Sequence, residues 1–311
     1  MGLGNQMFQY AAALALSFEK NTQLKVDISS YEGYKLRKYE LETCFNIDTA
    51  KATAEEIATF RFDNPVKRVW NKLIPSTKLR MLGLPYEEAG LPKAVLTIYD
   101  SIGSPHKRKT YQEPHYHFDR NFFNANKDVY LQGYWMSWKY FYKYDKQIRE
   151  AFTIKKELVR HLDKVVSELQ SSNSVSIHIR RTDLTDPFVT KLKGIISVQY
   201  YKNALAQLQQ RYNDLELYFF SDDIDWVKQN LQFNNLSVHY IDKTIASSAI
   251  EDFYLMMQCK HNIIANSTFS WWAAYLNEHE NKIIIAPKKW YSDAATYNYK
   301  DVYPTKWLKI E

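Results

Sequence analysis

The pattern of apolar and polar positions differs between the two halves of the chain. In the C-terminal half, short β-branched or apolar runs alternate with stretches of helical spacing. The runs predict strands and the stretches predict helices. The predicted strands are residues 174–179, 216–220, 237–241, 261–265 and 282–286, and the predicted helices are 199–212, 223–230, 247–259 and 268–277. This alternation is typical of a doubly wound parallel sheet, so we expect an α/β fold.

The N-terminal half is less regular. Its pattern predicts a helix at residues 6–20, a strand at 23–27, mainly helix over 54–74 and a strand at 127–132. A dense aromatic stretch at 134–144 then gives way to charged, mostly helical sequence. This change in composition predicts a domain boundary near residue 155, which divides the chain into domains of residues 1–155 and 156–311.

Composition narrows the class of protein. Of the 311 residues, 45% are hydrophobic and 24% charged, close to the average for soluble globular proteins. No apolar run approaches the roughly 18 residues of a membrane span, and the chain start lacks the pattern of a secretory signal. Two distant cysteines exclude a disulfide framework and a Cys-rich zinc site. We therefore expect a cytoplasmic protein without a transmembrane segment.

Charge and aromatic content point to classes of ligand. A net charge of +6 fits an anionic ligand but is too small to indicate nucleic acid. The chain has 24 tyrosines, 16 phenylalanines and 8 tryptophans. Tyrosine has a flat apolar face with a hydroxyl at its edge, which suits sugar rings but also fills ordinary cores.

Polar residues follow three of the predicted strands, where ligands of open α/β sheets bind. After the first strand come His178, Arg180, Arg181 and Asp183. Alternation places His178 and Arg180 on one side, and arginine forks match phosphate oxygens. The pattern favours a phosphate site over the alternative, an exposed basic turn paired with Asp183.

The residues of the other two groups could bind a ligand or could simply cap the helix that follows them. Asp222 follows the second strand, where a carboxylate can bind a ribose or a base edge, or can cap the next helix. Asp223 and Asp225 could form a metal site, but solvated charge at a helix start is the better interpretation. The segment of residues 266–268 lies at a helix start and can bind an anion or simply cap the helix.

Two weaker signals remain. Gly2 and Gly4 open the first helix and could permit close approach of a ligand, although a disordered chain start is an equal alternative. Met7 occupies the third glycine position of a dinucleotide fingerprint, which argues against that motif. The alternate pair His115 and His117 could bind metal, but a half-exposed strand is favoured.

These motifs, in this order, resemble those of the bacterial α-1,2-fucosyltransferases of glycosyltransferase family 11. The resemblance spans nearly the whole chain. It rests on GLGNQMFQYA at residues 2–11, YELETCFNI at 39–47, GYWMSWKYF at 133–141, HIRRTD at 178–183, QYYKNAL at 199–205, FSDDIDW at 220–226 and NSTFSWWAAYL at 266–276.

The resemblance implies a GT-B-like fold, with two Rossmann-type domains facing a cleft. The donor would be GDP-β-L-fucose and no metal or other cofactor would be needed. The acceptor would be a terminal galactose of an oligosaccharide or lipid-linked glycan, fucosylated at O2 during O-antigen or capsule biosynthesis. Such work would place the protein in the cytoplasm, at the inner face of the membrane. A non-catalytic carbohydrate-binding protein is the alternative.

The resemblance also assigns roles to residues. Arg180, Arg181 and Asp183 would form the catalytic set, with Arg180 on the β-phosphate and Arg181 in support. The donor would be bound by residues from four segments: Asn5, His178, Asp222, Asn266, Ser267, Thr268 and Phe269. Family members usually have a short strand before the glycine loop, which implies that the first strand of the N-terminal domain is missing here. Departures at Thr182 and residues 136–138 concern the acceptor more than the donor.

Overall fold

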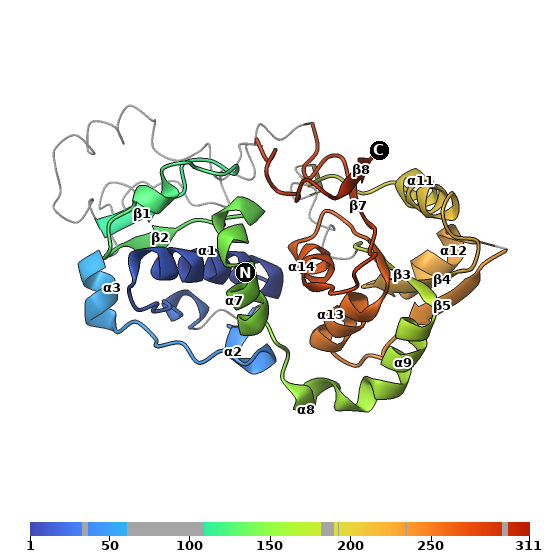
Figure 1. Ribbon diagram of the computed structural model, residues 1–311, viewed down its shortest axis with the longest axis horizontal. Helices are drawn as coiled ribbons and strands as arrows, with labels where there is room; N and C mark the ends of the chain where they lie inside the picture. Colours follow the sequence, from blue (N-terminus) through green and yellow to red (C-terminus); the bar gives the residue numbers. More distant parts are fainter. Residues whose placement is uncertain (33–36, 61–108, 182–189, 192, 234, 294–297) are drawn as a thin grey trace.

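The structure is a computed structural model that describes residues 1–32, 37–60, 109–181, 190–191, 193–233, 235–293 and 298–311. Figure 1 shows two lobes, one built from the first part of the chain and the other from the last. Helix α1 (Leu3–Lys20) belongs to the first lobe and α14 (Thr268–Leu276) to the second, and the N-terminal end of α1 lies next to α14. This two-lobed α/β arrangement is the one expected of a GT-B-like fold.

The C-terminal lobe contains a parallel sheet of six strands in the order β5-β4-β3-β6-β7-β8. The strands are β3 Asn173–Ile179, β4 Leu215–Ser221, β5 Ser237–Ile241, β6 His261–Ile263, β7 Ile284–Pro287 and β8 Leu308–Ile310. This is the strand order of a dinucleotide-binding fold, and the order reverses between β3 and β6. The prediction of a doubly wound parallel sheet is confirmed, although β8 was not predicted.

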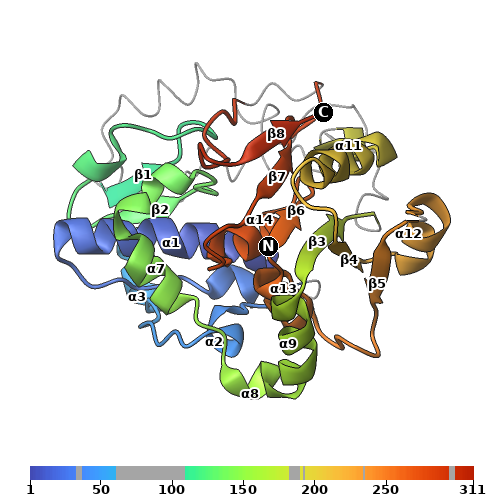
Figure 2. The same ribbon diagram turned by 45° about the vertical axis from the view of Figure 1, so that its right-hand side comes forward.

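Helices cover both faces of this sheet (Figure 2). On one face, α11 (Val198–Gln209) and α12 (Ile224–Asn230) pack against a core that includes Ile177 and Phe219. On the other face lie α9 (Asp163–Ser171), α13 (Ala249–Gln258) and α14. Each helix begins or ends within three residues of its sequence prediction, because its apolar residues recur at helical spacing.

The N-terminal lobe is built around α1, which begins three residues before its predicted start. A pair of short parallel strands, β1 (Thr110–Gln112) and β2 (Tyr130–Gln132), lies beside it. The remaining elements are η1 Ser29–Tyr31, α2 Leu41–Cys44, α3 Ala54–Phe60, η3 Phe122–Asn124, η4 Trp138–Tyr140, η5 Tyr142–Tyr144, α7 Asp145–Ala151, α8 Lys156–Val159 and η6 Arg160–Leu162.

Of the predictions for this lobe, one is wrong and one is confirmed only in part. The strand predicted at residues 23–27 is wrong: this stretch is extended but makes only an isolated bridge, between Val26 and Lys51. Helix predicted over 54–74 is confirmed as far as Phe60, and residues 61–74 lie outside the described residues. Within the described ranges, no helix combines the length and apolar character that crossing a bilayer requires.

One aromatic core joins the two lobes. Helix α14 is apolar on nearly every side, and its residues from 270 to 276 are buried between the sheet and α1. The ring of Phe8 on α1 lies 4.5 Å from Trp271 and 5.0 Å from Trp272, and Phe141 stacks on Trp272 at 5.1 Å. The boundary at residue 155 stays a prediction, since this continuous core draws on residues from both sides of it.

Candidate active site

The carboxyl ends of β3 and β6 lie side by side at the point where the strand order reverses. Val175 and Ile177 of β3 pair with His261 and Ile263 of β6 in parallel register. The chain leaves β3 through Arg180 and leaves β6 toward α14. Ligands of doubly wound sheets bind at this kind of edge, so the sheet itself brings the first and third predicted groups together.

The first turns of α1 and α14 meet at this edge. A Cβ atom added to Gly4 would lie only 2.5 Å from the carbonyl carbon of Thr268, so glycine is required by the closeness of the two backbones. The Thr268 hydroxyl donates to Oδ1 of Asn5 at 2.9 Å. The glycine pair was interpreted as leaving room for a ligand; in the structure, Gly4 makes room for α14.

Both helices begin without a side-chain cap or an acidic residue of their own first turn. Neither Gly2 nor Ser267, the N-cap residues, makes a capping hydrogen bond with a side chain, and neither first turn holds an acidic residue. In contrast, Asp223 caps α12 and Glu251 lies in the first turn of α13. Two uncapped N-termini that face the same place offer N–H groups and partial positive charge to an anion.

His178 lies next to the corner where α1 and α14 begin. Its ring is 6.0 Å from that of Phe269 in the first turn of α14, and the Tyr201 hydroxyl donates to its carbonyl oxygen at 3.1 Å. The structure therefore gathers four predicted residues at one corner, namely Asn5, His178, Thr268 and Phe269. Arg180 follows His178 by two residues, just past the end of β3, and its contact with this corner stays a prediction.

Arg181 belongs to a different group. Its guanidinium lies 3.8 Å from the centre of the Trp226 ring on α12, and its backbone N–H donates to Oδ1 of Asp222 at 2.8 Å. Trp226 packs on the sheet face that carries α11 and α12, whereas α14 covers the opposite face. Arg181 and Asp222 thus lie together on the side of the sheet that carries α11 and α12, away from α14.

Asn266 and Ser267 are both buried at the end of β6. The Asn266 amide donates to the carbonyl of Lys193 at 2.8 Å and to that of Trp290 at 3.3 Å, so this side chain ties two loops to the strand end. Ser267 is the N-cap residue of α14. Asp183 lies outside the described residues. The donor-binding roles of Asn266 and Ser267 stay predictions.

The candidate metal ligands have other partners. Asp223 accepts a hydrogen bond from the backbone N–H of Trp226 at 3.1 Å as the cap of α12, and Asp225 is exposed in its first turn. The rings of His115 and His117 stack 3.5 Å apart, and Nδ1 of His115 lies 2.8 Å from the His117 carbonyl oxygen. In the ranges that the structure describes, no three His, Cys, Asp or Glu side chains cluster as metal ligands would.

Sequence reasoning missed Trp226 and Asp252. Asp252 lies in the first turn of α13, at the ligand-binding end of the sheet, and burial raises its pKa to about 6. A carboxyl with a raised pKa at such an end is typical of functional sites. The aromatic residue within FSDDIDW and the acid pair opening α13 were the available signals, but helix capping explains both equally well.

The aromatic stretch after β2 serves packing. Trp135 is buried with a backbone φ of 58°, and the Glu113 carboxylate holds this turn by accepting from the N–H groups of Tyr134 at 2.6 Å and Trp135 at 3.0 Å. Met136 and Ser137 are also buried, and the Ser137 hydroxyl donates to the carbonyl of Asp301. These two departures from the family pattern therefore lie in the interior.

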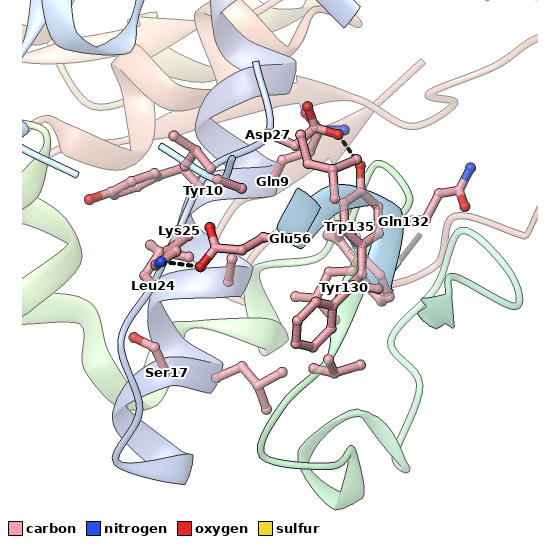
Figure 3. A pocket seen from close by; sticks show the side chains of 18 of the residues that line it. Gln9, Tyr10, Ser17, Leu24, Lys25, Asp27, Glu56, Tyr130, Gln132 and Trp135 are labelled. Atoms are coloured by element: carbon pink, nitrogen blue, oxygen red, sulfur yellow. Dashed lines mark hydrogen bonds and ion pairs between the residues drawn. The ribbon is translucent and has the colours of Figure 1, made fainter. Parts of the chain in front are cut away.

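A cavity of about 570 Å³ lies in the N-terminal lobe (Figure 3). One face of α1 forms its floor, and residues 22–27 and 127–133 line it from either side. The Tyr130 hydroxyl spans these two sides by donating to Asp27 at 2.7 Å. The cavity is separate from the residues at the α1–α14 junction.

Comparisons with known proteins identify the family of the chain. The model of glycosyl transferase family 11 matches residues 95–311. The chain is 33% identical to an alpha-1,2-colitosyltransferase of Escherichia coli, across 100% of this chain and 96% of that protein. It is 30% identical to the Escherichia coli O-antigen biosynthesis glycosyltransferase WbnK, covering 94% and 93%. A galactoside alpha-(1,2)-fucosyltransferase 1 of Leontocebus fuscicollis is 29% identical over 47% of this chain and 42% of its own.

Proposed function

The chain belongs to glycosyltransferase family 11, and from this membership we propose that it transfers L-fucose from GDP-β-L-fucose to O2 of a terminal galactose. The observation that carries the proposal is the convergence of the uncapped N-termini of α1 and α14 beside the strand end that holds Arg180. Such a corner suits a diphosphate, which is the leaving group of a nucleotide-sugar. Attack from the opposite face of the sugar would turn the β-linked donor into an α-fucoside.

The chemistry explains why positive charge is needed there. Breaking the bond between fucose and phosphate develops positive charge on the sugar and negative charge on the diphosphate. Fixed cations and N–H donors that face the leaving group stabilise this state more than the ground state, by about 3–4 kcal/mol for each donor. In our proposal Arg180 contacts the β-phosphate, and the first turn of α14 with Asn5 holds the diphosphate.

The remaining predicted residues are assigned to the nucleoside side. His178 and Phe269 lie together beside the α14 start, where their rings can contact the nucleoside. In our proposal Asp222, directly after β4, accepts from a ribose hydroxyl or a base edge, because ligands of such sheets bind beyond the carboxyl ends of the strands.

Transfer of colitose is the second candidate. It is favoured by the relative of 33% identity, which is named for colitosyl transfer. Colitose is fucose without its 3-hydroxyl, so the two sugars would present the same diphosphate to the same corner. Membership in a family of transferases disfavours the alternative of a non-catalytic carbohydrate-binding protein.

We also propose that the reaction needs no metal ion. The charge that Mg²⁺ or Mn²⁺ supplies to diphosphates in other enzymes would come here from Arg180 and the two helix N-termini. Activity is therefore expected to survive EDTA. Loss of activity in EDTA with rescue by Mn²⁺ would contradict this proposal.

A donor panel tests the proposed function. The protein is incubated with a β-galactoside acceptor and, separately, GDP-fucose, GDP-colitose, GDP-mannose and UDP-galactose, and the products are weighed by mass spectrometry. We expect a product heavier than the acceptor by one fucose, released together with GDP. A product from GDP-colitose alone would support the second candidate, and transfer from UDP-galactose alone would reject both.

A further inference from the structure

The side chain of Arg181 is held away from the diphosphate corner. Its guanidinium stacks on Trp226 at 3.8 Å, a distance at which a cation is attracted by the face of an indole ring. The strand explains the direction: Ile177 and Ile179 of β3 enter the core beneath α11 and α12, and Arg181 continues this series two residues later.

The backbone at the same residue is held too. The N–H of Arg181 donates to the Asp222 carboxylate at 2.8 Å, across from the end of β3 to the end of β4. This N–H belongs to the peptide that joins residues 180 and 181. A carboxylate that holds this peptide plane restrains the ψ dihedral of Arg180, and with it the direction in which the Arg180 side chain leaves the chain.

A buried tyrosine closes the third side. Tyr201 is 1% exposed and donates its hydroxyl to the carbonyl of His178, just before the arginines. Burial raises the pKa of this phenol most, while the charge of Arg181 lowers the pKa and that of Asp222 raises it. Groups from the end of β4, from α11 and from α12 therefore hold the segment from His178 to Arg181.

We propose that Trp226, Arg181 and Asp222 form a clamp that positions Arg180, and that Arg181 is a positioning residue rather than a ligand of the diphosphate. This inference rests on the proposed function, because Arg180 is taken to contact the leaving group. The three members act as one unit: the stack holds the Arg181 side chain, the carboxylate holds its N–H, and the peptide between them orients Arg180.

The alternative is that Arg181 swings to the diphosphate when the donor binds. Its guanidinium would then leave the Trp226 ring and cross from one face of the sheet to the other. The two possibilities differ in what Trp226 contributes. If the clamp is correct, Arg181 affects kcat only through its contacts with Trp226 and Asp222. If Arg181 binds the phosphate instead, its effect on kcat does not depend on the Trp226 ring.

A double-mutant cycle separates them. Arg181→Gln, Trp226→Leu and the double variant are compared for kcat, donor KM and the Kd of GDP, using whichever GDP-sugar the wild type turns over. We expect each single change to lower kcat roughly tenfold and the double variant to lie within about twofold of the worse single, because coupled residues are not additive. GDP Kd should change by less than about threefold, since no phosphate contact is lost.

Two variants act as controls. Trp226→Phe keeps an aromatic face and should return kcat to within about threefold of wild type. Lys228→Gln removes a cation from the same helix, where Lys228 lies over Tyr240 at 5.4 Å, and should leave kcat unchanged. Melting temperatures and circular dichroism show whether each variant is folded.

Amide hydrogen exchange gives a readout that does not depend on catalysis. The peptide containing Arg181 should exchange faster in Trp226→Leu than in Trp226→Phe if the stack supports the bond to Asp222. Three results would each overturn the clamp. They are losses in kcat that multiply in the double variant, a tenfold rise in GDP Kd from Arg181→Gln alone, and equal amide exchange in the two Trp226 variants. A wild type inactive with every GDP-sugar would instead overturn the proposed function.

Discussion

Thr268 donates its hydroxyl hydrogen to the side-chain oxygen of Asn5 at 2.9 Å, which joins the first turns of two helices from opposite ends of the sequence. The two residues are 263 positions apart. The bond holds the two N-termini, neither of which has a side-chain cap, next to each other. The corner that we propose for the diphosphate therefore forms only when α1 and α14 are packed together.

This packing predicts a severe effect of Gly4→Ala. The new methyl group would lie 2.5 Å from backbone atoms of Thr268, which cannot move aside as a flexible side chain could. We expect a loss of roughly 1–3 kcal/mol in stability and a marked fall in turnover, because the two helix starts would be pushed apart. Thermal unfolding and GDP release measure the two effects.

Gly2→Ala is the matched control for this prediction. Gly2 has a φ of −74° that alanine adopts without strain, and nothing lies within 4 Å of the position of a new Cβ. Its melting temperature and turnover should stay near wild type. A Gly4→Ala protein as stable and active as Gly2→Ala would contradict the close approach of α1 and α14.

Arg180→Lys should lose most of kcat while the fold is retained. Lysine keeps the charge but not the planar fork that contacts two phosphate oxygens at once. We expect a loss on the order of 10²-fold, as when one fixed donor at a developing anion is removed. Steady-state kinetics with an unchanged melting temperature would support this, and a variant within a few-fold of wild type would remove Arg180 from the leaving group.

The C-terminal sheet was predictable because its strands and helices repeat a simple period. Five of its strands follow from apolar runs, whereas β8 has only Leu308–Ile310 at the sheet edge, too short to show a pattern. The segment at residues 23–27 was mistaken for a strand because alternation reports exposure on one side and does not supply a pairing partner.

The sequence could predict which residues follow each strand, because apolar runs mark the strands and the polar residues come directly after them. It could not predict the stack of Arg181 on Trp226, since that contact depends on how α12 packs beside the end of β3. The roles of the two arginines toward a phosphate stay predictions. The contact of Gly4 with Thr268 could not be read from the sequence, since it depends on how two distant helices pack.

Buried His261 predicts a loss of stability in acid. The side chain is 0% exposed, Nδ1 accepts from the N–H of Ile283 at 3.0 Å, and burial, with the nearby charge of Lys260, lowers its pKa to about 4. In the unfolded chain the histidine has a pKa of about 6.5. The contribution of neutral His261 to the free energy of unfolding is therefore complete above about pH 6.5 and is lost as the pH falls toward 4. The loss is about 3 kcal/mol.

His261→Asn isolates this effect, because asparagine can accept the same hydrogen bond and does not titrate. The variant should unfold with a weaker dependence on pH between 6.5 and 4 than the wild type, in denaturant titrations at each pH. Parallel curves for wild type and His261→Asn would refute the assignment.

The linkage of the product tests the central claim most directly. The product made from GDP-fucose and a β-galactoside is examined by nuclear magnetic resonance, which reports both the anomeric configuration and the linked carbon. We predict an α-configured fucose whose anomeric proton correlates with C2 of the galactose. A β-configured fucose, attachment at another carbon, or the absence of any fucosylated product would contradict the account.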